Sequence, residues 1–365
     1  MNTPPFRADH VGSLLRPPAL REARAARAEG RISAEALRAI EDAAIRDAIA
    51  QQKAIGLKAV TDGEYRRAFW HFDFLAKLGG VEMYEADQGI QFKGGQTKAY
   101  GLKVTAPIRY QPHPFVADYA FLHANAGGAA PKLTIPSPSV LHFRGGRRAV
   151  DSHTYPDMDG FFADLGDAYA AAVADFAAAG CRYLQLDEVN IAYLCDPEQI
   201  AALKARGEET EGLLERYAAL INRAIANRPA DMFVSMHLCR GNFRSMHIAS
   251  GGYDPVAEVL FNGINVDAYF MEYDDERSGS FAPLRFLPRG KTVVLGLVTS
   301  KRGALESKDL LKRRIEEAAR HAPLEQLAIS PQCGFASTEE GNLLTVEEQW
   351  AKLRLCVEVA EEVWG

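Results

Sequence analysis

Short apolar and β-branched runs alternate with longer amphipathic segments along most of the chain, and most of the runs end in a small or polar residue. Eight such runs can be counted, at residues 8–13, 59–64, 133–139, 183–188, 234–239, 268–273, 292–300 and 327–334. Helical periodicity between them is clearest at residues 34–55, 158–180, 209–227, 307–322 and 345–363. This alternation is typical of a parallel sheet, and eight strands close a barrel. The pattern therefore predicts one α/β domain over residues 1–365, a (β/α)8 TIM barrel.

Residues 65–131 interrupt this rhythm after the second predicted strand. Gly-, Thr- and Tyr-bearing pieces at residues 90–110 predict a hairpin within the insertion. Long excursions from a compact barrel are usually functional, so the insertion is a candidate lid. A doubly wound open sheet is the competing architecture, but neither GxGxxG nor GxxxxGK[ST] follows the first predicted strand.

The composition argues against two classes of partner, nucleic acids and membranes. The net charge is −6, and Lys and Arg are scattered, which argues against a nucleic-acid partner. No apolar run approaches the roughly 20 residues that span a bilayer, and the first 16 residues carry Asp9 and several prolines, unlike a secretory signal. We expect a cytoplasmic protein with no membrane partner. A homodimer is a further expectation, although no interface pattern supports it.

Four residues at the predicted strand ends are candidate metal ligands. His237 and Cys239 stand two residues apart, so both side chains lie on one side of a strand. Glu272 ends the next strand and Cys333 the eighth, and the carboxyl ends of barrel strands meet at one face. One His, two Cys and one carboxylate suit zinc better than magnesium or calcium. Alternatively, the His-x-Cys spacing is accidental, Cys333 is an inert core thiol and Glu272 is an ordinary loop carboxylate.

The other three cysteines lie away from these strand ends, and five cysteines in a chain this long do not indicate a disulfide framework. We expect buried structural thiols at Cys181, Cys195 and Cys356.

The chain resembles the cobalamin-independent methionine synthase family in these segments. The zinc site of that family is matched by His237-Leu238-Cys239, Glu272 and Cys333-Gly334, and three further matches are residues 11–13 (VGS), 61–64 (TDGE) and 184–188 (LQLDE). The resemblance runs from residue 11 to residue 334 and covers only the catalytic C-terminal half of the long two-barrel enzymes. Residues 330–337 (SPQCGFAS) and 296–301 (GLVTSK) are similar to a short, single-barrel bacterial subgroup of the methionine synthase II type.

The resemblance implies a zinc-dependent S-methyltransferase that methylates homocysteine, with a methyltetrahydrofolate-type donor. Ser13 is then expected near the carboxylate of homocysteine, with Glu64 and Asp187 at its ammonium group. An ordinary thiol is mostly protonated at neutral pH, and zinc removes this proton. We expect the thiol to displace Glu272 or to add beside it. The alternative for the two acids is a structural ion pair with a nearby arginine such as Arg66 or Arg67.

Two positions depart from the long enzymes. Lys301 stands where they have a catalytic His, and we expect it to be the acid that protonates the donor, although a lysine is a weak acid unless its pKa is lowered. Pro138 stands where they have a Trp that stacks on the pterin. Three aromatic residues could supply a substitute wall: Trp70, Phe72 and Phe74.

Arg240 also departs from the long enzymes, and it could hold an acidic group of the donor or acceptor, or pair with Asp274 or Asp275. The same thiol chemistry could serve another donor, such as a methylated corrinoid protein or an epoxide opened by coenzyme M. A metal-free lyase of the uroporphyrinogen decarboxylase type and a zinc-storage protein are the remaining alternatives.

Overall fold

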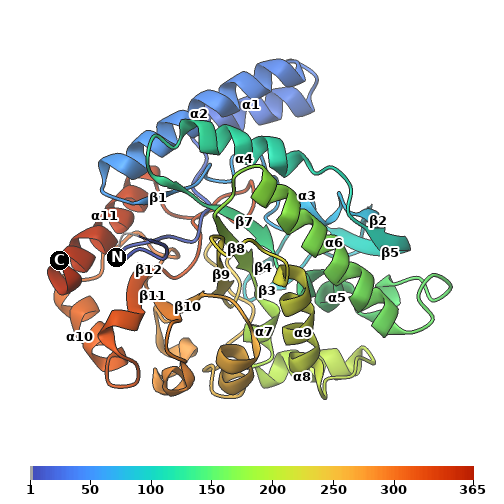
Figure 1. Ribbon diagram of the computed structural model, residues 1–365. Coiled ribbons are helices and arrows are strands. Elements are labelled where there is room, and N and C mark those ends of the chain that lie inside the picture. The colour runs from blue at the N-terminus through green and yellow to red at the C-terminus, as the bar shows by residue number, and fades with distance from the viewer. Residues whose placement is uncertain (1–2) are drawn as a thin grey trace.

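Six parallel strands form a continuous sheet at the centre of the computed structural model, which describes residues 3–365 (Figure 1). Their order in the sheet follows the chain: β7 (Leu133–Pro136), β8 (Tyr183–Asp187), β9 (Phe233–Leu238), β10 (Ala268–Glu272), β11 (Thr292–Val298) and β12 (Leu327–Pro331). Strand β1 (Ala59–Val60) pairs in parallel with β6 (Ala130–Pro131), which leads directly into β7. The described strands therefore include seven of the eight predicted runs.

The remaining run, residues 8–13, is the first along the chain and closes the barrel between β12 and β1. Ala8 forms a parallel bridge with Ile329 of β12, and the amide of Leu14 donates to the carbonyl of Gly63, beyond β1, at 3.0 Å. This segment forms a single bridge and no ladder, because the Asp9 side chain accepts the amide of His10 at 2.7 Å and so replaces a neighbouring strand as its partner. The α/β barrel that the sequence predicted is confirmed.

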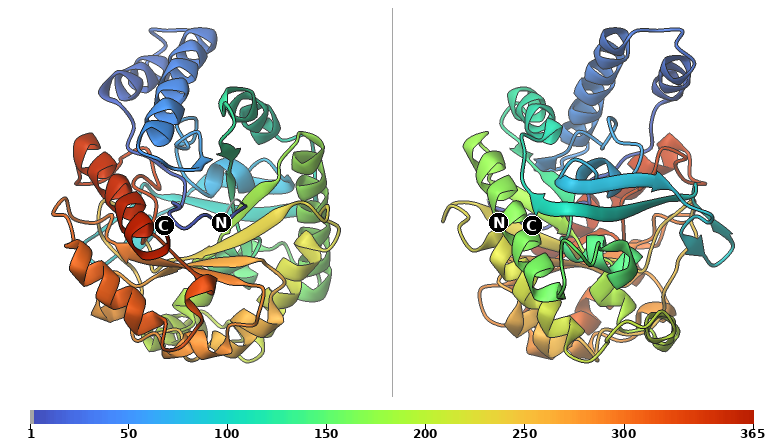
Figure 2. Two further views of the ribbon diagram at one scale, coloured as in Figure 1. Left: turned by 60° about the vertical axis from the view of Figure 1, so that its left-hand side comes forward. Right: turned by 90° about the vertical axis from the view of Figure 1, so that its right-hand side faces the viewer.

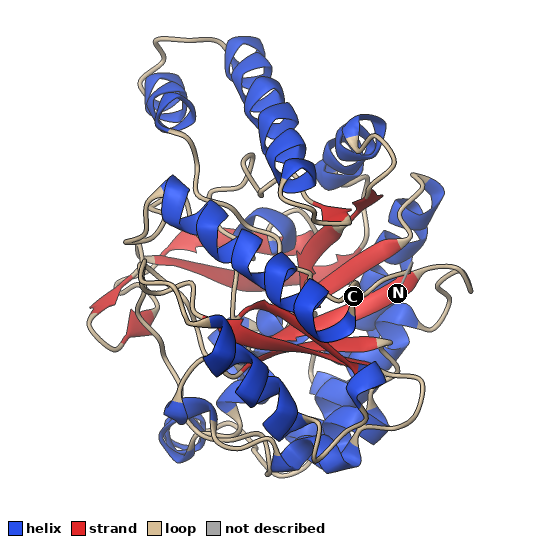
Figure 3. Ribbon diagram, turned by 90° about the vertical axis from the view of Figure 1, so that its left-hand side faces the viewer, coloured by secondary structure: helices blue, strands red, loops and turns tan. Residues whose placement is uncertain are grey.

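Helices surround the strands, and those with clear periodicity occur where the sequence placed them (Figure 3). They are α2 (Ala34–Ala54), α6 (Met158–Ala178), α9 (Leu213–Ile225), α10 (Lys308–Ala318) and α11 (Val346–Trp364). Four of these helices have an N-cap residue whose side chain accepts a backbone amide of the first turn. At α11, Thr345 and Glu348 form a capping box. Further helices are α1 (Pro18–Ala28), α3 (Phe72–Leu75), α4 (Pro114–Asn125), α5 (Ser139–Gly145), α7 (Asn190–Tyr193) and α8 (Pro197–Ala205). Helices α1 and α2 project beyond the barrel (Figure 2).

The insertion contains the predicted hairpin. Strands β2 (Gly79–Glu85) and β5 (Tyr100–Arg109) are antiparallel, and a smaller pair, β3 (Gln91–Phe92) and β4 (Gly95–Gln96), lies between them in the chain. Figure 2 shows this long hairpin extending across the barrel, with β3 and β4 at its far end. Helix α4 packs against α2 and α6, so it occupies the place of a barrel helix. Within residues 3–365, no helix is long and apolar enough to cross a membrane.

Candidate metal centre and substrate pocket

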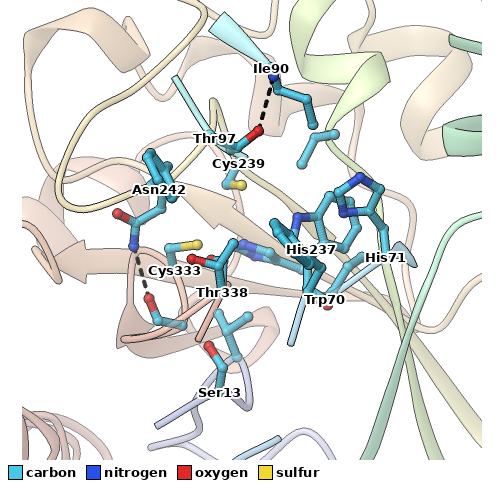
Figure 4. A pocket seen from close by; sticks show the side chains of 18 of the residues that line it. Ser13, Trp70, His71, Ile90, Thr97, His237, Cys239, Asn242, Cys333 and Thr338 are labelled. Atoms are coloured by element: carbon cyan, nitrogen blue, oxygen red, sulfur yellow. Dashed lines mark hydrogen bonds between the residues drawn. The ribbon is translucent and has the colours of Figure 1, made fainter. Parts of the chain in front are cut away.

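Three of the four predicted ligands meet at the carboxyl end of the barrel. His237 lies in β9, Cys239 follows that strand directly, and Cys333 comes two residues after β12. All three are buried, and each offers a ligand atom within 4.8 Å of the other two. Figure 4 shows their side chains around one pocket. The arrangement could hold a metal ion.

The chemistry of this group fits zinc. Both ring nitrogens of His237 are buried, and within the described part of the chain neither has a hydrogen-bond partner. A buried polar group without a partner costs free energy, and a metal bond would satisfy one nitrogen. The Cys333 sulfur and burial raise the pKa of the Cys239 thiol well above its ordinary value, so a cation between them is needed to hold both as thiolates. Two thiolates and one imidazole are a donor set that zinc prefers.

Glu272 lies beside this group and outside it. Its carboxylate is fully buried at the end of β10, accepts the amide of Arg240 at 2.8 Å, and forms an ion pair with Arg277. Burial would raise its pKa, but the nearby cations Lys301, Arg277 and Arg240 together lower it. Glu272 is therefore an anion next to the cluster, and its role as the fourth ligand stays a prediction.

The Arg240 side chain is directed into the protein and is not among the described residues that line the metal cavity. Its guanidinium is fully buried, donates to the Tyr253 hydroxyl at 2.9 Å and to the Gly251 carbonyl, and lies 4.2 Å from the centroid of the Tyr253 ring. Neither Asp274 nor Asp275 is its partner among the described ion pairs. Arg240 therefore holds the loop after β9 in place, because all its donor groups are directed into the protein.

The three predicted acceptor-binding residues, Ser13, Glu64 and Asp187, line the same cavity as His237, Cys239 and Cys333. The Ser13 hydroxyl accepts the amide of Ala336 at 3.3 Å, and the Ser13 carbonyl accepts the amide of Phe335 at 2.9 Å. A Cβ atom at Gly334 would lie 2.0 Å from the Ser13 hydroxyl oxygen, so a larger residue here would displace the Ser13 side chain. The Ser13 loop is thus fitted against the Cys333 loop.

Glu64 and Asp187 are buried acids on neighbouring walls of this cavity. Glu64 has the rare positive φ of 59°, accepts the Thr134 hydroxyl at 2.8 Å, and pairs with Arg67 at 3.4 Å, as the structural alternative predicted. Asp187 accepts the side-chain amide of Gln185 at 2.7 Å. Burial, with a smaller contribution from Asp187, raises the pKa of Glu64 to about 7, against the opposing effect of Arg67. Burial also raises the pKa of Asp187. Two such acids favour a cationic ligand, such as an ammonium group.

The raised pKa of Glu64 predicts how binding of an amino acid depends on pH. Below pH 7 the carboxyl is mostly protonated and loses its attraction for an ammonium group, whereas above pH 7 it is ionised. We expect the affinity for homocysteine to rise between pH 6 and 8, and this rise to be smaller in Glu64→Gln, as calorimetric titration would measure. A rise of unchanged size in Glu64→Gln would contradict this assignment.

Folding stability gives a second readout of the same group. The folded-state pKa of about 7 exceeds the unfolded value, so stability from the neutral form is present at low pH and is lost as pH rises through 7. The change in the free energy of unfolding caused by Glu64→Gln should therefore be more favourable at pH 8 than at pH 5, by about 2 kcal/mol. Urea denaturation at both pH values would measure this difference.

Lys301 is buried outside the cavity. Its ammonium group donates to the Gly241 carbonyl at 2.9 Å, in the loop that follows Cys239, and the part of the cavity lining that the structure describes does not include it. The structure thus places Lys301 as a support of the metal-site loop. Its predicted role as the catalytic acid stays untested.

The insertion supplies lining residues that the sequence analysis identified only in part. Of the three candidate aromatic residues, Trp70 lines the metal cavity and Phe72 a neighbouring one, whereas Phe74 is buried and stacks on His113 at 4.4 Å. His71, beside Trp70, also lines the metal cavity and was missed (Figure 4). Its position between aromatic residues in the sequence was the available signal.

A barrel with a His-Cys-Cys group at its strand ends and two buried acids beside it has an arrangement that could hold a soft metal ion next to a cationic ligand. The chain belongs to the cobalamin-independent methionine synthase family, because residues 6–362 match the family model described as "Cobalamin-independent synthase, Catalytic domain". The family that the sequence resembled is therefore confirmed.

Two of the relatives described here match this chain over nearly their whole length, and a third is a much longer enzyme. The uncharacterized protein YxjH of Bacillus subtilis is 52% identical over 361 residues, which are 99% of this chain and 95% of that protein. The crystal structure of a putative vitamin-B12 independent methionine synthase from Listeria monocytogenes has a TM-score of 0.80 and 42% identity, over 99% of this chain and 98% of that one. The 5-methyltetrahydropteroyltriglutamate–homocysteine methyltransferase of a Synechococcus strain is 22% identical over 91% of this chain, but only 40% of that enzyme is matched.

Proposed function

We propose that this protein is a zinc-dependent S-methyltransferase that transfers a methyl group from a methyltetrahydrofolate-type donor to homocysteine. The observation that carries the proposal is one cavity that holds both a His-Cys-Cys group and two buried acids. The relative from Synechococcus is named for this donor and this acceptor, which supports the same assignment. A reducing compartment such as the cytoplasm would keep both cysteines and the substrate thiol reduced.

Different residues of the cavity would bind the two ends of the acceptor, homocysteine. His237, Cys239 and Cys333 would hold zinc, which supplies the charge that keeps a substrate thiol deprotonated at neutral pH. Glu64 and Asp187 would bind the ammonium group, so that the sulfur is directed toward the metal group.

The Glu272 carboxylate has binding partners beside the cluster that do not depend on a metal. The Arg277 guanidinium and the Arg240 amide bind its carboxylate beside the cluster. If the substrate thiol takes the fourth position, these two groups would hold the released carboxylate without leaving a bare buried charge.

A methyl-transfer assay tests the proposal. Purified protein should contain one zinc per chain and should form methionine from homocysteine and methyltetrahydrofolate, with activity lost on chelation and restored by zinc. Zinc binding without methionine formation would favour one of the alternative donors, a methylated corrinoid protein or an epoxide with coenzyme M. A protein that binds no zinc would contradict the proposal.

A further inference from the structure

A buried arginine joins three loops around the acceptor side of the metal cavity. Arg16 follows the first segment of the barrel, and its side chain is 5% exposed. One arm of its guanidinium, Nη1, donates to the carbonyl of Thr338 at 3.1 Å. The other arm, Nη2, donates to the carbonyls of Glu64 at 3.0 Å and Arg67 at 2.6 Å. One side chain therefore connects the loops that follow the first segment, β1 and β12.

Arg16 acts on these loops and does not face a ligand. Burial lowers the pKa of Arg16 to about 10, so its guanidinium is still charged at neutral pH. Within residues 3–365 it forms no ion pair, and it is not among the described residues that line the metal cavity. Hydrogen bonds from a charged donor are stronger than those from a neutral one. The charge of Arg16 is therefore used on backbone carbonyls.

The loop after β1 needs such support at Glu64. Gly63 and Glu64 both have a positive φ, of 66° and 59°, and this conformation is rare for a residue with a side chain. The Asp62 carboxylate accepts the amide of Glu64 at 2.9 Å. Arg16 and the amide of Arg67 both bind the Glu64 carbonyl. A strained backbone persists only where its surroundings hold it, so Arg16 is one of the groups that keep Glu64 in this conformation.

The Thr338 contact extends this support to the side of the cavity that carries Cys333. Thr338 lies on the segment that follows Cys333, lines the metal cavity and forms an antiparallel bridge with Phe69 of the insertion. Figure 4 shows the side chains of Thr338 and Cys333 in the same pocket. Because Arg16 binds both Thr338 and Glu64, it relates the position of the Glu64 carboxylate to the metal group.

From these contacts, and resting on the proposed function, we propose that Arg16 is a positioning residue that holds the Glu64 carboxylate where it binds the ammonium group of the acceptor. Without Arg16, Glu64 can leave its strained backbone conformation, and the carboxylate loses its defined place in the cavity. The loss affects thiols that carry an ammonium group and spares thiols that lack one, since both kinds would reach the metal group through sulfur.

Equilibrium binding to the zinc-loaded protein tests the inference with two probes, homocysteine and 4-mercaptobutanoate, which is homocysteine without its amino group. A charge-assisted hydrogen bond contributes about 10- to 100-fold in affinity, so the wild-type protein should prefer homocysteine by a factor in this range. Arg16→Gln should lose about 10-fold of this preference and keep its affinity for 4-mercaptobutanoate. A general loosening of the cavity would instead weaken the binding of both probes and leave their ratio unchanged. Calorimetric titration would measure both affinities.

Two further variants separate positioning from charge and from folding. When Arg16→Gln is added to Glu64→Gln, it should cause no further loss of preference, because the carboxylate that Arg16 positions is already absent. Arg16→Lys keeps the positive charge, but its compact ammonium cannot span the carbonyls that the two arms of the guanidinium reach. It should also lose preference for homocysteine, and it is the test if Arg16→Gln does not fold.

The matched control is Arg7→Gln. Arg7 stands at the start of the same segment, donates to the carbonyls of Glu325 and Leu327 at 3.1 Å and 2.5 Å, and does not line the described part of the metal cavity. This variant should keep the wild-type ratio of the two affinities.

Three results would overturn the inference: a wild-type ratio in Arg16→Gln, a wild-type ratio in Arg16→Lys, or an equal loss when Arg16→Gln is added to Glu64→Gln. A wild-type protein that prefers homocysteine and forms methionine would keep its proposed function under any of these results. If the wild-type protein does not prefer homocysteine, the inference fails together with the acceptor assignment of the proposed function.

Discussion

The variant Cys333→Ser is expected to lose its zinc and, with it, methyl transfer. Cys333 offers one of three ligand atoms in a buried group, and a serine hydroxyl is a much poorer zinc ligand than a thiolate. Zinc affinity should fall at least about 100-fold. Activity should fall on the order of 10³-fold, since a catalytic metal contributes several kcal/mol of transition-state stabilisation. Elemental analysis after dialysis and a methionine assay would measure the two effects.

Cys195→Ser is the matched control, because Cys195 is also a buried thiol. Its sulfur lies 3.7 Å from the Ile191 carbonyl and is not part of the group that could hold a metal. This variant should keep one zinc per chain and most of its activity. A Cys333→Ser protein that retains both would contradict the metal site, whereas loss of zinc from both variants would indicate a general effect of the substitution on folding.

The second large effect is on stability, at a buried ion pair that joins the first segment of the barrel to β7. The ammonium group of Lys132, next to β7, donates to the His10 carbonyl at 2.6 Å and lies 3.4 Å from the Asp9 carboxylate, and both charged side chains are fully buried. The Tyr183 hydroxyl donates to Asp9 at 2.8 Å. Lys132→Met would leave the Asp9 charge without its counter-ion, and we expect the free energy of unfolding to fall by about 3–5 kcal/mol. Urea denaturation would measure the loss.

A double variant separates charge from packing at this pair. Asp9→Asn together with Lys132→Met removes both charges, so it should be more stable than Lys132→Met alone. Asp9→Asn alone is measured as well. If the double variant loses as much stability as Asp9→Asn and Lys132→Met lose together, the two charges are not coupled and the explanation is wrong. Because the segment after Asp9 carries Ser13, zinc content should be measured in the same variants to show whether the site is also affected.

The metal group could be predicted from the sequence because two simple geometric rules fix it. Alternation along a strand places His237 and Cys239 on one side, and the convergence of barrel strands adds Cys333 from the far end of the chain. The same rules also bring Glu272 to this face, but they could not predict its ion pair with Arg277, a residue after β10 that no periodic pattern positions.

Residues on irregular segments were the hardest to predict. Lys301 stands at the expected place in the chain, but its direction depends on the Gly241 carbonyl, which it binds. Helix α1 was missed because an Ala- and Arg-rich segment has few apolar positions to define a face.

Zinc X-ray absorption spectroscopy, with and without homocysteine, tests the central claim most directly. The free protein should show zinc bound by two sulfur atoms and one imidazole, together with a lighter donor such as the carboxylate of Glu272. Addition of homocysteine should raise the number of sulfur ligands from two to three, because the substrate thiol joins the group. An unchanged zinc environment at saturating homocysteine would contradict the claim that this site activates the thiol.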